Sequence, residues 1–205
     1  QAGLAVQKDG TSTFYDRFRG RVIFPIKDIH GNIIAFGGRA TTDAEQPKYL
    51  NSPETSLYQK SETLFGIDLA KQAMRKQNQA ILVEGYFDQI RAVQHGVENV
   101  VATCGTALTA KQAGVIRNHA ETVILIFDSD PAGRSASKKG FDILLEQGLN
   151  VKIVALPEGQ DPDSFIHEKG AEAFLHEIEN AKHFIESYID ALIEKTPGKT
   201  PADRV

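Results

Sequence analysis

"LIFDSDPAGR", residues 125–134, places two aspartates immediately after the apolar run "TVILIF", residues 122–127. A short apolar run bounded by polar and turn residues is typical of a buried strand. Pro131 suits the first turn of a helix that follows. Asp128 and Asp130 are alternate residues, so their side chains are expected to point the same way and to reach one metal ion or two neighbouring ones. The stretch therefore predicts a strand, an acidic loop and a helix in succession.

The same alternation continues on both sides of this stretch and predicts an α/β fold. Strands are expected at residues 80–84, 99–103, 122–127 and 150–156, and helices at residues 87–95, 109–119 and 131–147. Such a series forms a parallel sheet that is flanked by helices.

The N-terminal part has a different pattern. "RVIFPI", residues 21–26, and "NIIAFGG", residues 32–38, predict two antiparallel strands joined by a turn, and a connecting helix is expected at residues 64–74. Residues 163–194 are expected to be helical, with one apolar stripe formed by Phe174, Ile178, Ala181 and Ile185. We therefore predict an α+β part at residues 1–78, the parallel sheet at residues 79–164 and a helical segment at residues 165–205.

Carboxylates follow three of the four predicted strands, and Gly105 with Thr106 follows the remaining one; chemistry in open parallel sheets collects at this edge. The acids in question are Glu84, Asp128, Asp130, Asp161 and Asp163. Crowded carboxylates need a compensating cation, and hard divalent ions such as Mg²⁺ or Mn²⁺ prefer oxygen ligands. A helix N-cap is the alternative interpretation of Asp130, but capping does not require the partner carboxylates. Glu84 taken singly is better explained by a salt bridge, whereas the five acids together favour the metal site. Gly85, directly after Glu84, allows another group to approach closely.

Charge is distributed unevenly along the 205 residues, whose net charge is −4. Up to Lys60 there are eight basic residues against six acidic ones, and the remainder has fifteen against twenty-one. This balance argues against a strongly basic nucleic-acid binder, but it places a basic part beside an acidic one. Alternation predicts that Arg17, Arg19 and Arg21 lie on one face of a strand, where they would contact phosphates.

The remaining composition is that of an ordinary globular chain. No apolar run is long enough to span a bilayer, and a single cysteine, Cys104, cannot form an internal disulfide. A cytoplasmic, reducing compartment fits these features. The abrupt ends of the sequence lead us to expect a piece of a longer protein.

Several of these motifs resemble a known family. "ILVEGYFD", "IFDSDPAG" and "GQDPDSF" resemble the three acidic motifs of the toprim fold in bacterial DNA primases of the DnaG type. "DRFRGRVIFPI", "GNIIAFGGR" and "PKYLNSPET" resemble the segment that precedes toprim in those primases, and "ATCGTALT" resembles the loop after their second toprim strand. The resemblance extends from about Tyr15 to Phe165.

The resemblance implies a toprim-like sheet and a catalytic core that synthesises short RNA primers on a single-stranded DNA template from NTPs at the bacterial replication fork. Glu84, Asp128 and Asp130 match the catalytic acids, and these three with Asp161 and Asp163 match the residues that bind Mg²⁺ or Mn²⁺. The residues that match template-binding or nucleotide-binding positions are Arg17, Arg19, Arg39, Lys48, Asn51 and Lys60. In the family a zinc-binding module lies upstream, and a C-terminal domain, absent from this sequence, contacts the replicative helicase.

Two other classes remain open from the sequence. A toprim-type nuclease or topoisomerase would use similar acids, and Tyr86 would then be a candidate nucleophile, although its position on a helix with Phe87 and Ile90 favours packing. A receiver-like signalling module also ends parallel strands in acidic residues, but it requires a lysine at a later strand end. Here that strand is followed by "PEGQDPD".

Overall fold

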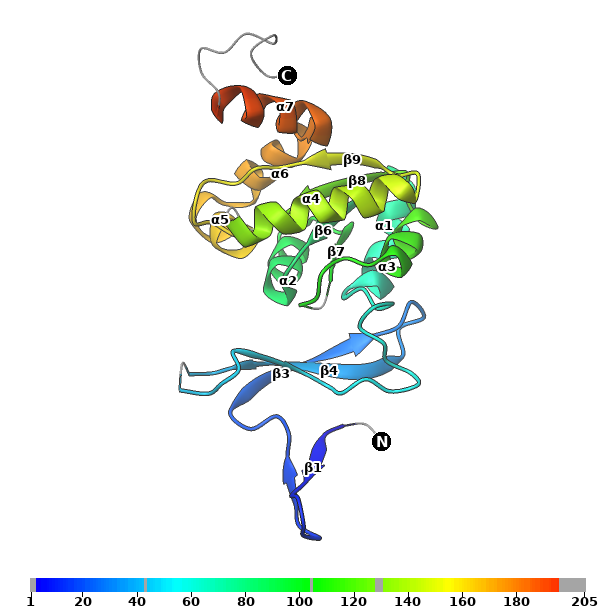
Figure 1. Ribbon diagram of the computed structural model, residues 1–205, viewed down its shortest axis with the longest axis vertical. Helices are drawn as coiled ribbons and strands as arrows, with labels where there is room; N and C mark the ends of the chain where they lie inside the picture. Colours follow the sequence, from blue (N-terminus) through cyan, green and yellow to red (C-terminus); the bar gives the residue numbers. More distant parts are fainter. Residues whose placement is uncertain (1–2, 43, 104, 128–130, 196–205) are drawn as a thin grey trace.

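A five-stranded sheet forms the centre of the structure, a computed structural model that describes residues 3–42, 44–103, 105–127 and 131–195 (Figure 1). Its strands are β6 (Gln79–Val83), β7 (Val100–Ala102), β8 (Thr122–Ile126), β9 (Asn150–Ile153) and β10 (Lys182–His183), in the order β10-β9-β8-β6-β7. Strands β7, β6, β8 and β9 are parallel, and β10 adds an antiparallel edge. The predicted α/β class is confirmed.

Helices cover both faces of this sheet, as Figure 1 shows. They are α1 (Ile67–Gln77), α2 (Tyr86–Gln94), α3 (Ala110–Arg117), α4 (Pro131–Glu146), α5 (Pro162–Lys169), α6 (Ala171–Glu179) and α7 (Phe184–Lys195). Alternate residues of one strand belong to two separate core clusters: Ile124 and Ile126 pack on one face, and Val123 and Leu125 pack on the other. Because both faces are buried, the strands are continuously apolar.

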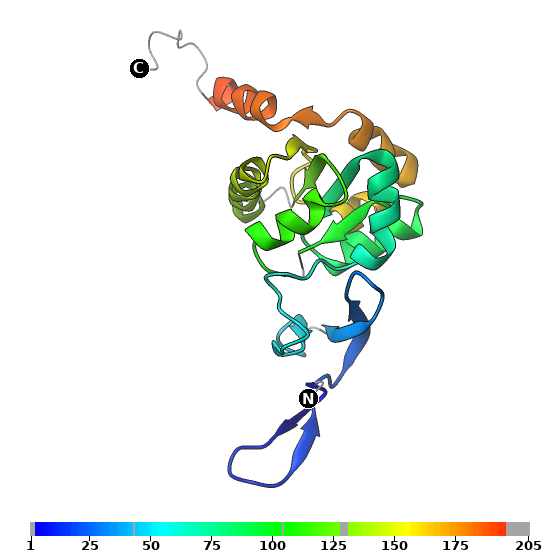
Figure 2. The ribbon, with the colours of Figure 1, turned by 90° about the vertical axis from the view of Figure 1, so that its right-hand side faces the viewer.

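The N-terminal part consists of antiparallel strands, as predicted. A hairpin of β1 (Ala5–Gln7) and β2 (Phe14–Asp16) precedes a three-stranded sheet of β3 (Arg21–Lys27), β4 (Ile33–Ala40) and β5 (Tyr49–Asn51). Both views show the β1–β2 hairpin at one end of an elongated molecule and α7 at the other (Figures 1 and 2). No helix in the described part of the chain is long and apolar enough to cross a membrane.

An aromatic cluster joins the N-terminal sheet to the parallel sheet. The ring of Phe24, on β3, lies 4.6 Å from Tyr86, 5.8 Å from Phe65 and 6.2 Å from Phe87, measured between ring centroids. The backbone of Gly37, opposite on β4, comes so close that a Cβ atom there would lie 2.1 Å from the Phe24 ring. The junction between the two sheets is therefore a packed core rather than a linker.

Two expectations about local structure are wrong. Residues 163–194 are not one helical stretch, because Gly170 ends α5 and β10 separates α6 from α7; Ile185 is 57% exposed and does not continue the Phe174 stripe. Arg17, Arg19 and Arg21 do not share a strand face either. β2 ends at Asp16, and a turn containing Gly20 at φ 60° precedes β3, so the three side chains point to different partners.

We expect that Phe24→Ala weakens the junction between the two sheets. Loss of a buried aromatic ring and the cavity it leaves cost about 3–5 kcal/mol of unfolding free energy. Denaturant unfolding measures the change, and Phe14→Ala is the matched control because Phe14 is 63% exposed. Equal stability of the two variants would contradict the packing described here.

Candidate active site

The parallel register places Glu84 at the carboxyl edge of the sheet. Val83 pairs with Ile126 of β8 and with Ala102 of β7, so Glu84, Phe127 and Thr103 each follow a paired residue at the same edge. Glu84 is half-buried. Asp128 and Asp130 directly follow Phe127 in the sequence, but they lie outside the described residues.

A cavity of about 330 Å³ opens beside Glu84. Its wall combines the ends of β6, β7 and β8 with helix α4, and it includes Glu84, Thr103, Gly105, Thr106, Phe127 and Lys139. This cavity brings a carboxylate and an ammonium group together among hydroxyl and backbone groups, and it lies where the strand ends meet.

A second cavity, of about 410 Å³, brings the N-terminal part to the same loops. It is lined by Arg17, Tyr49, Leu50, Asn51, Lys60, Gly85, Tyr86 and Gly105. Gly105 lines both cavities, so they adjoin. Arg17 is held in place because its Nε and Nη2 donate to the backbone carbonyl of Asn51 at 3.2 and 3.1 Å. Three of the predicted nucleotide-binding residues thus meet the glycine that follows Glu84.

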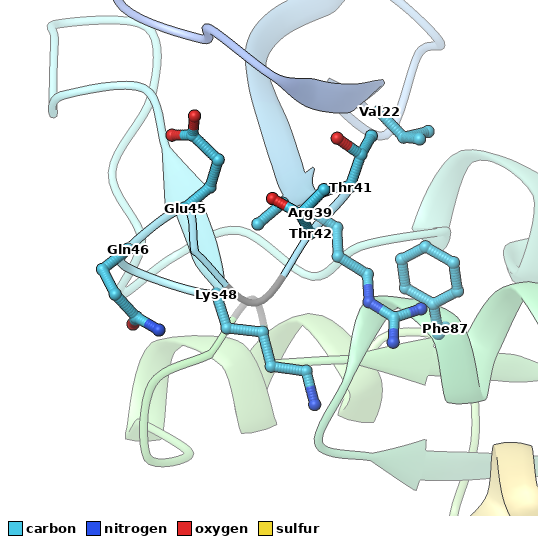
Figure 3. Close-up of a pocket in the computed structure, with 9 residues that line it drawn as sticks. Val22, Arg39, Thr41, Thr42, Glu45, Gln46, Lys48 and Phe87 are labelled. Carbon is cyan, nitrogen blue, oxygen red and sulfur yellow. The ribbon is translucent and has the colours of Figure 1, made fainter.

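Arg39 and Lys48 line a third cavity, of about 530 Å³, together with Thr41, Glu45 and Phe87 (Figure 3). The Arg39 guanidinium carbon lies 4.5 Å from the ring centroid of Phe87 and 6.0 Å from that of Tyr49. Lys48 Nζ lies 5.9 Å from the Tyr49 ring. These cation–π contacts fix Arg39 against α2 of the parallel-sheet unit.

Arg19 lies elsewhere, in the turn between β2 and β3. It is exposed, and its guanidinium carbon lies 5.1 Å from the Tyr15 ring centroid. Arg21 reaches the backbone carbonyl of Lys48 through Nη1 at 3.4 Å.

Asp161 and Asp163 begin helix α5. Oδ1 of Asp161 accepts a hydrogen bond from the backbone N–H of Ser164 at 2.7 Å, which makes Asp161 the N-cap. Oδ1 of Asp163 accepts from Nε of Arg91, on α2, at 2.6 Å.

Sequence reasoning missed Asp88, which connects these elements. Its carboxylate accepts from the backbone N–H of Gly85 at 2.9 Å and from the backbone N–H of Asp163 at 3.1 Å. The available signal was an acid at the third position of a helix that begins at Tyr86, which is the acidic half of a capping box.

The described carboxylates alone do not form a metal centre. Within the described ranges, no three carboxylate, imidazole or thiolate side chains come close enough to hold an ion. Glu84 offers the hard oxygen ligand that Mg²⁺ or Mn²⁺ prefers, at the edge where residues 128–130 follow β8. The carboxylate of Glu84 therefore fits a divalent cation, although the described residues alone do not complete a set of ligands.

Tyr49 lies between the basic and acidic groups. Burial raises the pKa of its phenol above the ordinary value, and the carboxylates of Asp88, Asp163 and Asp161 raise it further, whereas Arg39 lowers it. The phenol therefore stays protonated at neutral pH and keeps a donor near the acids that begin α5.

Comparison with known proteins gives the family of this chain. Residues 1–71 match a family model described as the N-terminal domain of the DNA primase catalytic core, and residues 81–166 match one described as toprim-like. The chain belongs to the DNA primases of the DnaG type. The resemblance found in the acidic and basic motifs is confirmed.

Individual relatives of this DnaG-type chain agree. The DNA primase of Clostridium acetobutylicum is 46% identical over 197 residues, which are 95% of this chain and 32% of the relative. The primase of Aquifex aeolicus is 43% identical over 91% of this chain and 38% of its own length. The chain therefore spans about a third of the length of these curated relatives.

Solved structures match over the whole fold. The crystal structure of the zinc-binding and RNA polymerase domains of the Aquifex aeolicus primase has a TM-score of 0.86 at 40% identity, over 94% of this chain and 48% of that one. The structure of a DnaG primase catalytic domain bound to ssDNA has a TM-score of 0.86 at 36% identity, over 99% of this chain and 64% of that one.

The pKa of Tyr49 provides a test of this arrangement. We expect a spectrophotometric titration, taken as the difference between the parent and Tyr49→Phe, to place its ionisation above the ordinary value of 10.0. Because the folded pKa is raised, the linked stabilisation is complete below the unfolded pKa and is lost as pH rises through the folded one. Asp163→Asn should lower this pKa, and Arg39→Gln should raise it. Ionisation of Tyr49 below its ordinary pKa would contradict the geometry.

Proposed function

We propose that this chain forms part of the catalytic core of a primase, which joins NTPs into a short RNA primer on a single-stranded DNA template. The observation that carries the proposal is the second cavity. Arg17, Asn51 and Lys60 line it together with Gly85, which follows Glu84, and Gly105, which precedes Thr106. A nucleotidyl transfer site needs both kinds of group, because cationic side chains hold phosphates and acids hold metal ions.

The acidic residues have the metal-binding task in this proposal. Glu84, Asp128 and Asp130 would hold one or two Mg²⁺ or Mn²⁺ ions, and Asp161 and Asp163 lie at the start of α5. Divalent ions at such a site lower the pKa of the attacking hydroxyl and neutralise the charge of the pyrophosphate that leaves. The protein's own contribution is to keep Glu84 and the acidic loop at one edge of the sheet.

The basic residues bind phosphates. Arg17 and Lys60 reach the cavity beside Gly85, while Arg39 and Lys48 line the neighbouring cavity. The ssDNA-bound DnaG structure supports a single-stranded template for this chain as well. We place the template along Arg19, Arg39 and Lys48, and the triphosphate near Arg17, Asn51 and Lys60.

The wider setting follows from the family. We propose that residues 1–78 and 79–164 act as the basic and toprim units, that residues 165–205 form a helical extension, and that the protein works in the bacterial cytoplasm with a replicative helicase. These assignments rest on the relatives' description as DNA primases.

One observation disfavours the topoisomerase alternative. A covalent nucleophile must reach the DNA backbone, but the side chain of Tyr86 is only 3% exposed and packs between Phe24 and Phe65. Its ring is buried, as its position on the helix predicted, and it forms part of the junction between the sheets.

Asp130→Asn tests the catalytic assignment. In a full-length primase that carries this sequence, it should reduce primer synthesis by about 100-fold or more, because it removes a group that stabilises transition-state charge, and it should leave ssDNA affinity nearly unchanged. A primer-synthesis assay run beside a DNA-binding titration measures both. Asp142→Asn, at an exposed position of α4, is the control. Normal primer yield from Asp130→Asn would remove the acidic loop from the mechanism.

Salt dependence tests the basic residues. Alanine at Arg19, Arg39 and Lys48 should flatten the dependence of ssDNA affinity on salt, by about 0.7 in the logarithmic slope for each phosphate that the variant no longer binds. The control removes Arg75, Lys76 and Arg117, which are exposed in the last turns of α1 and α3 and precede β6 and β8. These residues lie at the opposite edge of the sheet. Equal slopes for both triple variants would move the template path away from the N-terminal part.

A further inference from the structure

Asp88 is a buried carboxylate that serves two helices at once. Its side chain is at the third position of α2, and the residue is 6% exposed. Oδ2 accepts from the N–H of Gly85, the N-cap of α2, and Oδ1 accepts from the N–H of Asp163, in the first turn of α5. Each of these donors is a backbone group that the helix itself leaves unsatisfied. A buried charge is tolerated here because two helix N-termini, which carry partial positive charge, converge on it.

This contact leaves no room for a Cβ atom at the residue after Glu84 unless the Asp88 carboxylate moves. The backbone of Gly85 has φ −102° and ψ 155°, which any residue can adopt. A Cβ atom at this position, however, would lie 2.6 Å from Oδ2 of Asp88. The close approach that the sequence predicted at Gly85 is thus made by the carboxylate of Asp88.

A second contact between α2 and α5 holds the side chain of Asp163. Asp163, whose N–H donates to Asp88, accepts in turn from Arg91 one turn further along α2. Asp88 and Arg91 therefore hold both the backbone and the side chain of Asp163, and helices α2 and α5 pack against each other.

We propose that Asp88 is a positioning residue of the metal site: it holds the Glu84–Gly85 segment and the first turn of α5 in a fixed relation, and it does not itself bind the metal. Both its oxygens already accept backbone hydrogen bonds, so its charge does not depend on an ion for compensation. Asp163, paired with Arg91, belongs to the same support rather than to the metal ligands. This inference rests on the proposed function only in that Glu84 is a metal ligand.

The supporting role predicts a measurable cost for metal binding. Residues that orient a ligand typically contribute about 10–100-fold to metal affinity. In Asp88→Asn, the side-chain NH₂ cannot accept a hydrogen bond, so one of the two backbone N–H groups loses its acceptor. We expect Mn²⁺ affinity, measured by calorimetry, to fall about tenfold, and the Gly85 or Asp163 amide to exchange faster with solvent deuterium.

Two further variants separate positioning from folding. Gly85→Ala keeps the charge of Asp88 but pushes the carboxylate away, so it should weaken Mn²⁺ binding as Asp88→Asn does. Asp68→Asn is the matched control, because Asp68 also lies in the first turn of a helix, α1, and its side chain is 10% exposed beside Lys27. It should leave Mn²⁺ binding and the exchange of Gly85 and Asp163 unchanged.

The outcomes distinguish this inference from the proposed function. If the parent chain binds no Mn²⁺, the metal assignment fails, while faster amide exchange in Asp88→Asn still reports the contact. If the parent binds Mn²⁺ and both Asp88→Asn and Gly85→Ala bind it equally well, the positioning role is wrong. Loss of affinity of about 1,000-fold or more in Asp88→Asn, with both amides still protected, would instead make Asp88 a ligand.

Discussion

The parallel pairing of β6 with β8 is the constraint on which the rest of the site depends. The two strands form five consecutive pairs, from Gln79 with Thr122 to Val83 with Ile126. The carboxyl ends of two strands that are far apart in the sequence therefore lie side by side at one edge of the sheet. Both faces of these strands are covered by helices, so a slip of the register would disrupt two cores at once. This pairing is why Glu84 and the segment that begins at Phe127 belong to one edge.

Two further sets of contacts position residues around this edge of the sheet. The aromatic cluster around Phe24 fixes the antiparallel sheet beside it, and this places Arg17, Asn51 and Lys60 against Gly85. Asp88, which accepts from the N–H of Gly85, connects the start of α2 to the start of α5. The basic side chains thus reach the glycine that follows Glu84 at a packed junction, which suits the proposed nucleotidyl transfer, because such catalysis consists largely of positioning and charge stabilisation.

Much of this arrangement could be predicted from the sequence. Continuous apolar runs identify strands buried on both faces, and the order of strands and helices identifies the sheet. Carboxylates directly after those runs predict a functional edge, at which the structure places Glu84. The connection between the sheets was not predictable, because Phe24 and Tyr86 are only apolar residues until the fold brings their rings together. Asp88 was missed because it looks like an ordinary first-turn acid, and its second partner, Asp163, is 75 residues away. The prediction that Arg17, Arg19 and Arg21 share one strand face was wrong, because a turn containing Gly20 interrupts the strand between them.

The most direct test of the account is the position of Mn²⁺ in crystals of this chain, located by anomalous scattering. We expect Mn²⁺ bound to Glu84 together with Asp128 or Asp130, with Asp88 still accepting from Gly85 and Asp163 still paired with Arg91. An ion bound instead between Asp88 and Asp163, away from Glu84, would contradict both the assignment of the metal ligands and the supporting role of Asp88.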